Sequence, residues 1–394
     1  MKKLVYFDNS ATTPLSFAAR DELMRYASEK YQECEEYNNI ERSFANPSSL
    51  HRAGFNAERR LEECREIIAG TMGCRAAEIY FTSGGTESDN LAIFGAVYAR
   101  ARRGKTIITT DSEHPAVGEP MKKLESDGYK VIRLSTSGGR LDTDMLRSAA
   151  SEDVIFASIM RVNNETGAIY DIKTASDIIK RASPGAIIHS DCVQSYLKEK
   201  ISPSMLGADL FSVSAHKIHA LKGCGALYVK SGTRLISQLL GGGQEKALRS
   251  GTENTVGISV FAAAAADGYE KLNENNAHIA FLSSQIRNFV INLPGVKLLE
   301  PPSSLPSIIS MSVPGIKSEV MLHLLSDEGI CVSSGSACSS KKGKSSVLHA
   351  YGLTDAEADS TIRISLSPMN TEEETIYFCD ILANMIKTKW KTIL

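Results

Sequence analysis

The stretch Phe211-Ser-Val-Ser-Ala-His-Lys217 is a short apolar strand pattern that ends in serine and histidine and is followed directly by a lysine. It belongs to a series of strand-like runs that alternate with helical patterns. The strand-like runs cover residues 78–82, 106–110, 130–134, 154–160, 186–189, 210–213 and 225–229, and the helical patterns cover 86–103, 115–127, 143–150 and 172–182. Such alternation is typical of a doubly wound, mainly parallel sheet with helices on both faces. The sequence therefore predicts an α/β fold.

The flanking patterns predict three parts of the chain. They are an extended N-terminal arm over residues 1–16, a large domain over 17–262, and a smaller α+β domain over 263–394. Helical character over 256–293 leads out of the large domain. Beyond Pro294 the pattern mixes strands and helices: strands over 307–312, 330–333 and 361–365, and helices over 318–327 and 371–389.

Length and composition indicate an ordinary soluble enzyme. A chain of 394 residues is too long for one compact core, and 42% hydrophobic and 23% charged residues are normal for a globular protein. The net charge of −2 offers no electrostatic footprint for nucleic acid or an anionic membrane. No signal peptide and no apolar run near the ~20 residues of a membrane span are evident. We therefore expect a cytoplasmic protein.

Most of the eight cysteines are expected to be buried, reduced thiols. They lack paired CxxC spacing, so no metal site is predicted, and a chain of this size without a signal sequence is not expected to rely on disulfides. Cys338 is the exception, because it lies in the Gly/Ser-rich loop pattern Ser334-Gly-Ser-Ala-Cys-Ser-Ser340. A thiol on such a loop can reach a site, react and withdraw.

Several polar residues follow the strands of the predicted sheet, where ligands of open α/β sheets bind. Phe81-Thr-Ser-Gly-Gly-Thr86 is a strand, a glycine turn and a helix start, which suits either a phosphate or a plain turn with a helix cap. Ser214 and His216 add donors that favour the phosphate. Lys217, next to them, is a natural former of a covalent bond to a carbonyl cofactor.

Asp191, Gln194 and His114 also follow predicted strands. Asp191 is either a helix N-cap or the partner of a protonated pyridine nitrogen, and Gln194 is placed to donate to a ring oxygen. His114 is either a satisfied loop histidine or a catalytic imidazole stacked on a ring.

Arg363 interrupts an apolar strand pattern, so its guanidinium needs a carboxylate. That carboxylate belongs either to a structural salt bridge or to a substrate. Asn163-Asn164-Glu165-Thr166-Gly167 is typical of a turn. The segments Gly241-Gly-Gly-Gln-Glu245 and Arg249-Ser-Gly-Thr252 are loop-like and rich in donors.

Taken in order along the chain, these motifs resemble those of the cysteine desulfurases of the class-V aminotransferase superfamily. The resemblance is strongest to the subgroup that supplies sulfur for iron–sulfur clusters and tRNA thiolation. The motifs are Asn46-Pro-Ser-Ser with His51, Phe81-Thr-Ser-Gly-Gly-Thr-Glu-Ser88, Glu113-His114, Asn163-Asn-Glu165, Asp191-x-x-Gln194, Ser214-x-His-Lys217, Gly241-Gly-Gly-Gln244, Arg249-Ser-Gly-Thr252 and Ser334-Gly-Ser-Ala-Cys-Ser-Ser340.

The resemblance implies a homodimer of pyridoxal 5'-phosphate (PLP) fold type I and a role for each motif. Lys217 would bind PLP covalently, with His114 stacked over the ring, Asp191 on the ring nitrogen and Gln194 on the ring oxygen. The phosphate would be bound by Gly85, Thr86, Ser214 and His216, joined by Thr252 of the partner subunit. The substrate would be oriented by Arg363, Asn164 and, more weakly, Asn46.

The implied reaction converts L-cysteine to L-alanine. Lys217 would move the Cα proton, and the Cys338 thiolate would take the sulfur as a persulfide for an acceptor or iron–sulfur scaffold protein. The alternatives are another class-V PLP reaction, such as selenocysteine lysis or transamination, and a non-enzymatic sulfur-carrier scaffold.

The sequence departs from the family pattern at four places. Gly85 stands where alanine is usual, a change expected to matter little, and Cys192 adds a second, oxidisable thiol beside Asp191. His219-Ala-Leu221 replaces the usual Tyr-Gly-Pro, and Lys246-Ala-Leu248 replaces arginine-rich sequence.

Overall fold

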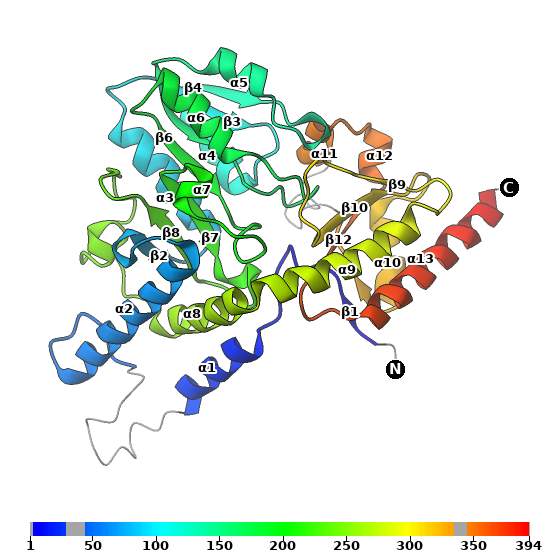
Figure 1. Cartoon of the computed structure of the whole chain (residues 1–394), viewed down its shortest axis with the longest axis horizontal. Coiled ribbons are helices and arrows are strands. Elements are labelled where there is room, and N and C mark those ends of the chain that lie inside the picture. Colours follow the sequence, from blue (N-terminus) through cyan, green and yellow to red (C-terminus); the bar gives the residue numbers. More distant parts are fainter. Residues whose placement is uncertain (1–2, 29–43, 335–344, 394) are drawn as a thin grey trace.

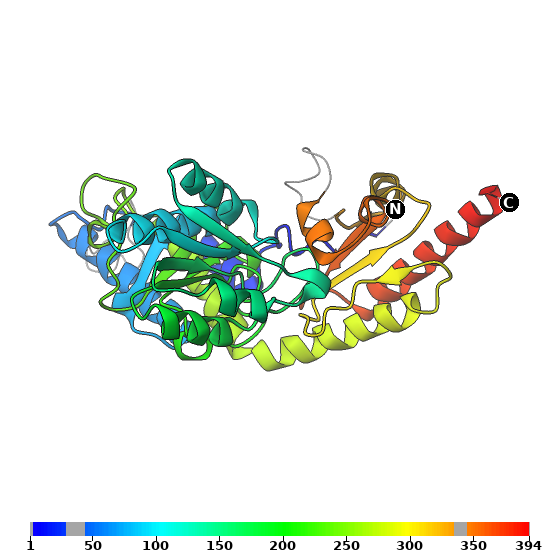
Figure 2. The same cartoon turned by 90° about the horizontal axis from the view of Figure 1, so that it is seen from above.

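The computed structural model describes residues 3–28, 44–334 and 345–393, with the side chains of the last few residues excepted. Cys338 lies outside the described residues. Figure 1 shows two bodies joined by a long helix, with both ends of the chain on the smaller body. The view in Figure 2 shows that the two bodies lie side by side along the longest axis of the molecule.

A seven-stranded sheet forms the centre of the larger body. In spatial order its strands are β2 (Ile79–Thr82), β8 (Gly225–Val229), β7 (Leu210–Ser214), β6 (Ile187–Asp191), β5 (Val154–Ser158), β3 (Thr106–Thr110) and β4 (Lys130–Leu134). Only β8 runs antiparallel to its neighbours, β2 and β7. The sheet is thus doubly wound and mainly parallel, as predicted.

Helices cover both faces of this sheet, which explains why its strands are apolar on both sides. Ile107 and Ile108, neighbours on β3, belong to two different hydrophobic clusters. One cluster packs under α3 (Gly85–Ala99) and α4 (Pro115–Ser126). The other includes residues of α1 (Phe17–Ser28), α2 (Arg52–Met72), α5 (Thr143–Ala149), α6 (Ile172–Ala182), α7 (Pro203–Leu206) and α8 (Thr255–Glu270).

The smaller body is α+β. Its strands are β9 (Lys297–Leu298), β10 (Ile308–Ser312) and β12 (Thr361–Ser365) in an antiparallel sheet, and β1 (Val5–Tyr6) and β11 (Ile330–Cys331) in a parallel pair. Its helices are α9 (Leu272–Val290), α10 (Ser318–Asp327), α11 (Ser346–Tyr351), α12 (Asp355–Asp359) and α13 (Glu372–Ile393).

The hydrophobic core changes from one body to the other within the α8–α9 pair. Ala265 of α8 belongs to the core of the larger body, whereas Ile279 of α9 belongs to the core of the smaller one. The division at residues 262 and 263 falls inside α8 and stays a prediction. No helix in the described part of the chain is long and apolar enough to cross a membrane.

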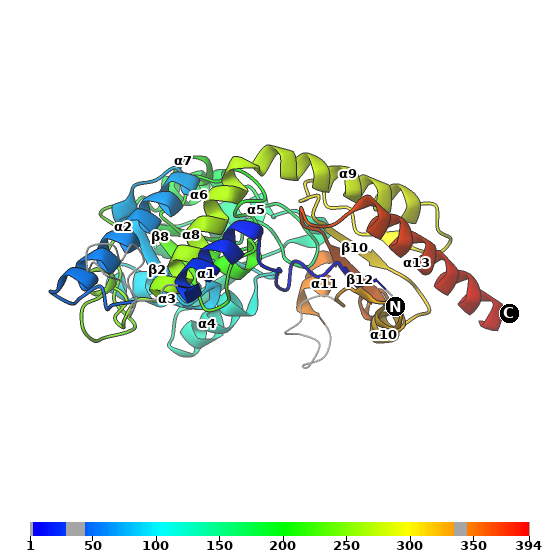
Figure 3. The ribbon, with the colours of Figure 1, turned by 90° about the horizontal axis from the view of Figure 1, so that it is seen from below.

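The N-terminal arm runs from the smaller body to the larger one (Figure 3). Val5 and Phe7 are buried in the core of the smaller body, and Asn9 donates its backbone N–H to the Ser365 carbonyl. Farther on, the Thr13 N–H donates to the His216 carbonyl, just before Lys217. The arm therefore passes directly by the carboxyl end of β7.

Candidate active site

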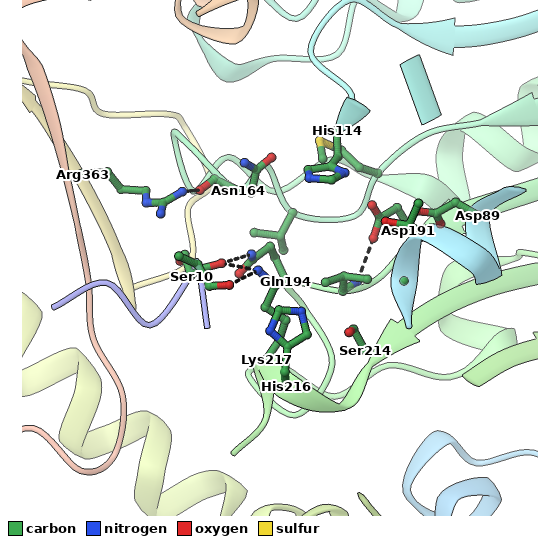
Figure 4. A pocket seen from close by; sticks show the side chains of 16 residues that line it. Ser10, Asp89, His114, Asn164, Asp191, Gln194, Ser214, His216, Lys217 and Arg363 are labelled. Atoms are coloured by element: carbon green, nitrogen blue, oxygen red, sulfur yellow. Dashed lines mark hydrogen bonds between the residues drawn. The ribbon is translucent and has the colours of Figure 1, made fainter. Parts of the chain in front are cut away.

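A cavity of about 260 Å³ lies at the carboxyl ends of the parallel strands, facing the smaller body (Figure 4). Its lining consists of Ser10, Ala11, Gly85, Thr86, Asp89, His114, Met160, Val162, Asn164, Asp191, Val193, Gln194, Ser214, His216, Lys217 and Arg363. Most of the residues predicted from the sequence are therefore brought together. Thr252 and Asn46 do not line this cavity; both are exposed.

The N-terminus of α3 forms an anion cradle at one end of the cavity. Gly84, the N-cap, has φ of 149°, a conformation that suits glycine, and no side chain caps this end of the helix. The first-turn N–H groups have no partners within the helix, so they and the helix dipole favour an anion there. The hydroxyls of Thr86 and Ser214, and the His216 ring, lie in the same lining. The set suits a phosphate group.

Lys217 extends its amine into the cavity, where the arm holds it. Its Nζ donates to the carbonyl oxygens of Ser10 at 2.6 Å and Ala11 at 2.8 Å. The Gln194 Nε2 donates to the same Ser10 carbonyl at 2.9 Å, and the Lys198 Nζ donates to Gln194 Oε1 at 2.9 Å. The Lys198 contact orients the Gln194 amide so that its NH₂ group faces the arm.

Asp191, at the end of β6, is a buried carboxylate in a tight turn. The Val193 N–H donates to its Oδ1 at 2.9 Å, and no helix follows β6 directly, so the N-cap alternative is wrong. Burial raises the pKa of Asp191 to about 6, although the Val193 N–H and the Lys217 charge act to lower it. Asp191 is thus mainly ionised at neutral pH and can accept a hydrogen bond from a cationic ring.

Asp89 lies next to Asp191 in Figure 4 and is also buried. Burial, and then the Asp191 charge, raise its pKa well above the ordinary range. Because two neighbouring buried carboxyls resist holding two charges, Asp89 is the neutral member of the pair. Nearby His189 is kept neutral, since burial lowers its pKa to about 3.

His114 caps α4 and lines the cavity at the same time. Its Nδ1 accepts from the Ala116 N–H at 3.1 Å, which leaves the proton of the neutral ring on Nε2. Burial, and then the Lys217 charge, lower the pKa of His114 to about 4. The imidazole is therefore neutral near pH 7, satisfied on one side and directed to the cavity on the other.

Arg363 lies at the opposite end of the lining from the anion cradle. Its Nη1 donates to the Asn164 carbonyl at 2.7 Å, and its Nη2 pairs with Asp8 Oδ1 at 2.8 Å. Asn163 is used up by its turn, because its Oδ1 accepts from the Glu165 and Thr166 N–H groups. Asn164, not Asn163, lines the cavity, which is the choice made from the sequence.

Two further findings concern the cysteines. Cys192 is fully buried, and burial raises its pKa to about 12, so this thiol is poorly suited to oxidation. The segment that carries Cys338 is described only at its two ends. Before it, the Ser333 N–H donates to the Arg363 carbonyl; after it, the Ser345 hydroxyl donates to Glu165 Oε2 at 2.6 Å. Both ends therefore adjoin the cavity lining.

Sequence reasoning missed the contribution of the arm, of Asp89, and of the apolar side chains of Met160, Val162 and Val193. The polar stretch Asp8-Asn-Ser-Ala-Thr-Thr13 after a short apolar run was a usable signal for the arm. Among the described residues, no group of three or more His, Cys, Asp and Glu side chains is arranged to hold a metal ion.

Comparison with known proteins adds the family. The family model described as Aminotransferase class-V matches residues 5–378. The chain is 38% identical over 386 residues to a NifS/IcsS protein homolog of Lactobacillus delbrueckii subsp. bulgaricus, with 95% of each protein covered. It is 38% identical over 394 residues to the cysteine desulfurase IscS of Klebsiella pneumoniae subsp. pneumoniae, with 98% of this chain and 93% of that protein covered.

Solved structures agree with this assignment. One described as a NifS-like protein matches with a TM-score of 0.89 and 36% identity over 98% of this chain and 100% of the other. Another, described as SspA in complex with cysteine, matches with a TM-score of 0.79 and 30% identity over 94% of this chain and 100% of the other. The chain therefore belongs to the class-V aminotransferase family, in the group of the cysteine desulfurases that its motifs resemble.

Proposed function

We propose that this chain is a PLP-dependent cysteine desulfurase that converts L-cysteine to L-alanine and carries the sulfur away as a persulfide on Cys338. The observation that carries the proposal is the composition of one cavity. It combines a lysine amine, a buried carboxylate and an anion cradle with an arginine from the smaller body.

The lining fits PLP in three respects. The cradle at the start of α3 offers backbone and hydroxyl donors for a phosphate. Gly85 and Val193 pack tightly against each other, because a Cβ at Gly85 would lie 2.7 Å from Val193 Cγ2, so glycine keeps the start of the cradle free of a side chain. Asn164 Oδ1 and Ser10 Oγ are buried without a hydrogen-bond partner among the described residues, so the lining has polar capacity in reserve for a ligand.

Each residue then has a role toward the cofactor. Lys217 would hold PLP covalently, Gly85, Thr86, Ser214 and His216 would bind its phosphate, and Gln194 its ring oxygen. Asp191 would keep the ring nitrogen protonated. When bound, PLP supplies an electron sink that makes the Cα proton of the amino acid acidic.

The chain's own residues complete the reaction. Arg363 and Asn164 orient the carboxylate of L-cysteine, and Lys217 moves the Cα proton. His114, neutral at working pH, is suited to exchange a proton at its Nε2. The Cys338 thiolate attacks the substrate sulfur, so an S–S bond forms and the Cβ–S bond breaks. The electron pair of that bond stays with the three-carbon fragment, which takes up a proton at Cβ, regains one at Cα and leaves as L-alanine.

We also propose a cytoplasmic homodimer that hands its sulfur to an acceptor protein for iron–sulfur cluster assembly or tRNA thiolation. Thr252, exposed in this chain, would complete the phosphate site of the partner subunit. Exposed apolar side chains on the neighbouring loop, among them Leu239 and Leu240, support a covered surface there. A role for Asn46 toward the substrate depends on the same assembly.

Mass spectrometry of the PLP-loaded protein after treatment with L-cysteine tests the proposal. Borohydride reduction should leave a pyridoxyl group on Lys217, and a persulfide should be found on Cys338. Cys338→Ser should abolish sulfur transfer to an acceptor, whereas the matched control Cys331→Ser should retain it. Undiminished transfer by Cys338→Ser would falsify the thiolate step, and alanine release that is independent of Cys338 would favour another class-V PLP reaction.

A further inference from the structure

Arg363, which the proposed function reserves for the substrate carboxylate, already faces a carboxylate of its own chain. Asp8 Oδ1 lies 2.8 Å from Arg363 Nη2, and the Asn164 carbonyl accepts from Nη1. Arg363 is only 2% exposed, and its Nε has no hydrogen-bond partner among the described residues. Only some of the N–H donors of the guanidinium therefore have acceptors, and the Nε–H at the edge of the cavity is among those without one in the described part of the chain.

The backbone around Asp8 explains why this carboxylate stays near Arg363. Phe7, before it, is buried in the core of the smaller body, and Asp8 itself forms a β-bridge with Ser365 of β12, two residues from Arg363. The Asp8 carbonyl accepts from the Ala11 N–H at 3.0 Å, which closes the turn whose next carbonyls hold Lys217. Asp is a favoured first residue of such turns.

The side chain of Asp8 is less constrained than its backbone. It is 20% exposed, so it can be re-solvated if its partner is taken, whereas the Arg363 side chain is almost fully enclosed. Of the two members of the pair, the carboxylate is the one able to move aside.

We propose that Asp8 competes with the α-carboxylate of the amino acid for Arg363 and so lowers the affinity of the site for substrate and product alike. This inference rests on the proposed function, because it takes Arg363 as the carboxylate-binding residue. Asp8 either moves away when the ligand binds or shares the guanidinium with it. In both cases two carboxylates compete for one cation, and each weakens the interaction of the other with Arg363.

The competition has a consequence for turnover. L-cysteine and L-alanine carry the same α-carboxylate, so an unopposed Arg363 would bind substrate and product equally well. Such uniform binding lowers KM without raising kcat, and it slows the release of the product. Asp8 reduces both affinities and returns to Arg363 as L-alanine leaves. It also keeps the buried guanidinium paired between turnovers.

The test uses isothermal calorimetry to compare the binding of two compounds to PLP-loaded protein: L-alanine, and L-alaninamide, in which an uncharged amide replaces the carboxylate. Asp8→Asn keeps an oxygen acceptor but removes the charge. Its Kd for L-alanine should fall on the order of fivefold, because a charge-assisted hydrogen bond is about twice as strong as a neutral one. The Kd for L-alaninamide should not change, and Asp8→Glu, which keeps the charge, should resemble the native protein.

An unchanged or weaker affinity of Asp8→Asn for L-alanine overturns the inference, since a purely structural Asp8 would only misplace Arg363 when altered. Asp8→Ser, a second charge-removing variant, should shift the Kd in the same direction and serves if Asp8→Asn does not fold. Arg363→Gln separates the two levels of the argument. If it still prefers L-alanine to L-alaninamide, the proposed function has the wrong carboxylate residue; if that preference is lost but Asp8→Asn is unaltered, only the role of Asp8 fails.

Discussion

The contact between Gly85 and Val193 argues against the expectation that glycine in place of alanine at position 85 matters little, and it makes Gly85→Ala a sharp test of the cofactor cradle. A Cβ on Gly85 would lie 2.7 Å from Val193 Cγ2, a separation that real Cβ atoms do not tolerate, so one of the two must shift. Gly85 is the first residue of α3, and its N–H belongs to the anion cradle. A shift there moves the donors of the cradle along with the backbone.

The size of the effect follows from two opposing terms. Overpacking by one methyl group costs about 1–3 kcal/mol. Replacing glycine by alanine in a helix recovers up to about 1 kcal/mol of conformational entropy. With the full entropy gain, we therefore expect Gly85→Ala to lower the free energy of unfolding by at most about 2 kcal/mol and to weaken PLP binding by on the order of tenfold.

The assay is a double-variant cycle with Val193→Ala, read by thermal unfolding of the PLP-free protein and by PLP titration. Val193→Ala removes the methyl group that the added Cβ at position 85 would meet, so the double variant should regain the PLP affinity that the single Gly85 variant loses. If the Gly85→Ala penalty is the same whether residue 193 is valine or alanine, the contact is not its cause and the reasoning is refuted.

Three more predictions concern strain and buried charge. Ala247 has φ of 61°, a left-handed conformation that favours glycine, so Ala247→Gly should raise the free energy of unfolding by about 1 kcal/mol in urea titrations. Burial raises the pKa of Glu113 from 4.5 to about 8; the folded state therefore holds more protons than the unfolded state in that window, and stability should fall as pH rises through it. Glu113→Gln should flatten this fall between about pH 5 and 8, and an equal slope in both proteins would contradict the assignment. Glu245→Ala removes the buried carboxylate that pairs with Arg65 and leaves the exposed Glu62 as its ionic partner among the described residues, so it should cost about 3 kcal/mol, against at most about 1 for the exposed control Glu119→Ala.

The central sheet was predictable from the sequence because each of its strands has a local cause. β8 is buried on both faces, and its apolar run ends at Val229, where the strand ends. β1 and β9 are different: each has two residues, and neither has a local pattern long enough to recognise. They form because β1 pairs with β11 and β9 pairs with β10. Such pairing depends on the tertiary structure and is not visible in the local sequence.

The candidate site was predictable where side chains with distinctive chemistry follow strands, as at Asp191 and Lys217. It was not predictable where the backbone supplies the contact. The carbonyls of Ser10 and Ala11 accept from Lys217. Every residue has a backbone carbonyl, so the sequence does not indicate which of them will accept a hydrogen bond in the site. The expectation of an oxidisable Cys192 was wrong for a related reason, since only the structure reveals that the thiol is completely enclosed.

Burial also determines which ionisable side chains in and around the cavity carry a charge at neutral pH. His114 and His216 are held neutral, as their pKa values are lowered to about 4, and Asp89 and Glu113 are held neutral by pKa values that are raised. Among the lining residues, charge thus remains on Lys217, Arg363 and Asp191, and Asp8 pairs with Arg363 from outside the lining. A phosphate at the start of α3 would be bound mainly by neutral donors, namely the first-turn N–H groups and the neighbouring hydroxyls. If Arg363 binds the carboxylate of the amino acid, as proposed, that carboxylate meets Asp8 at the same guanidinium, and the affinity for the amino acid should then depend on the N-terminal arm.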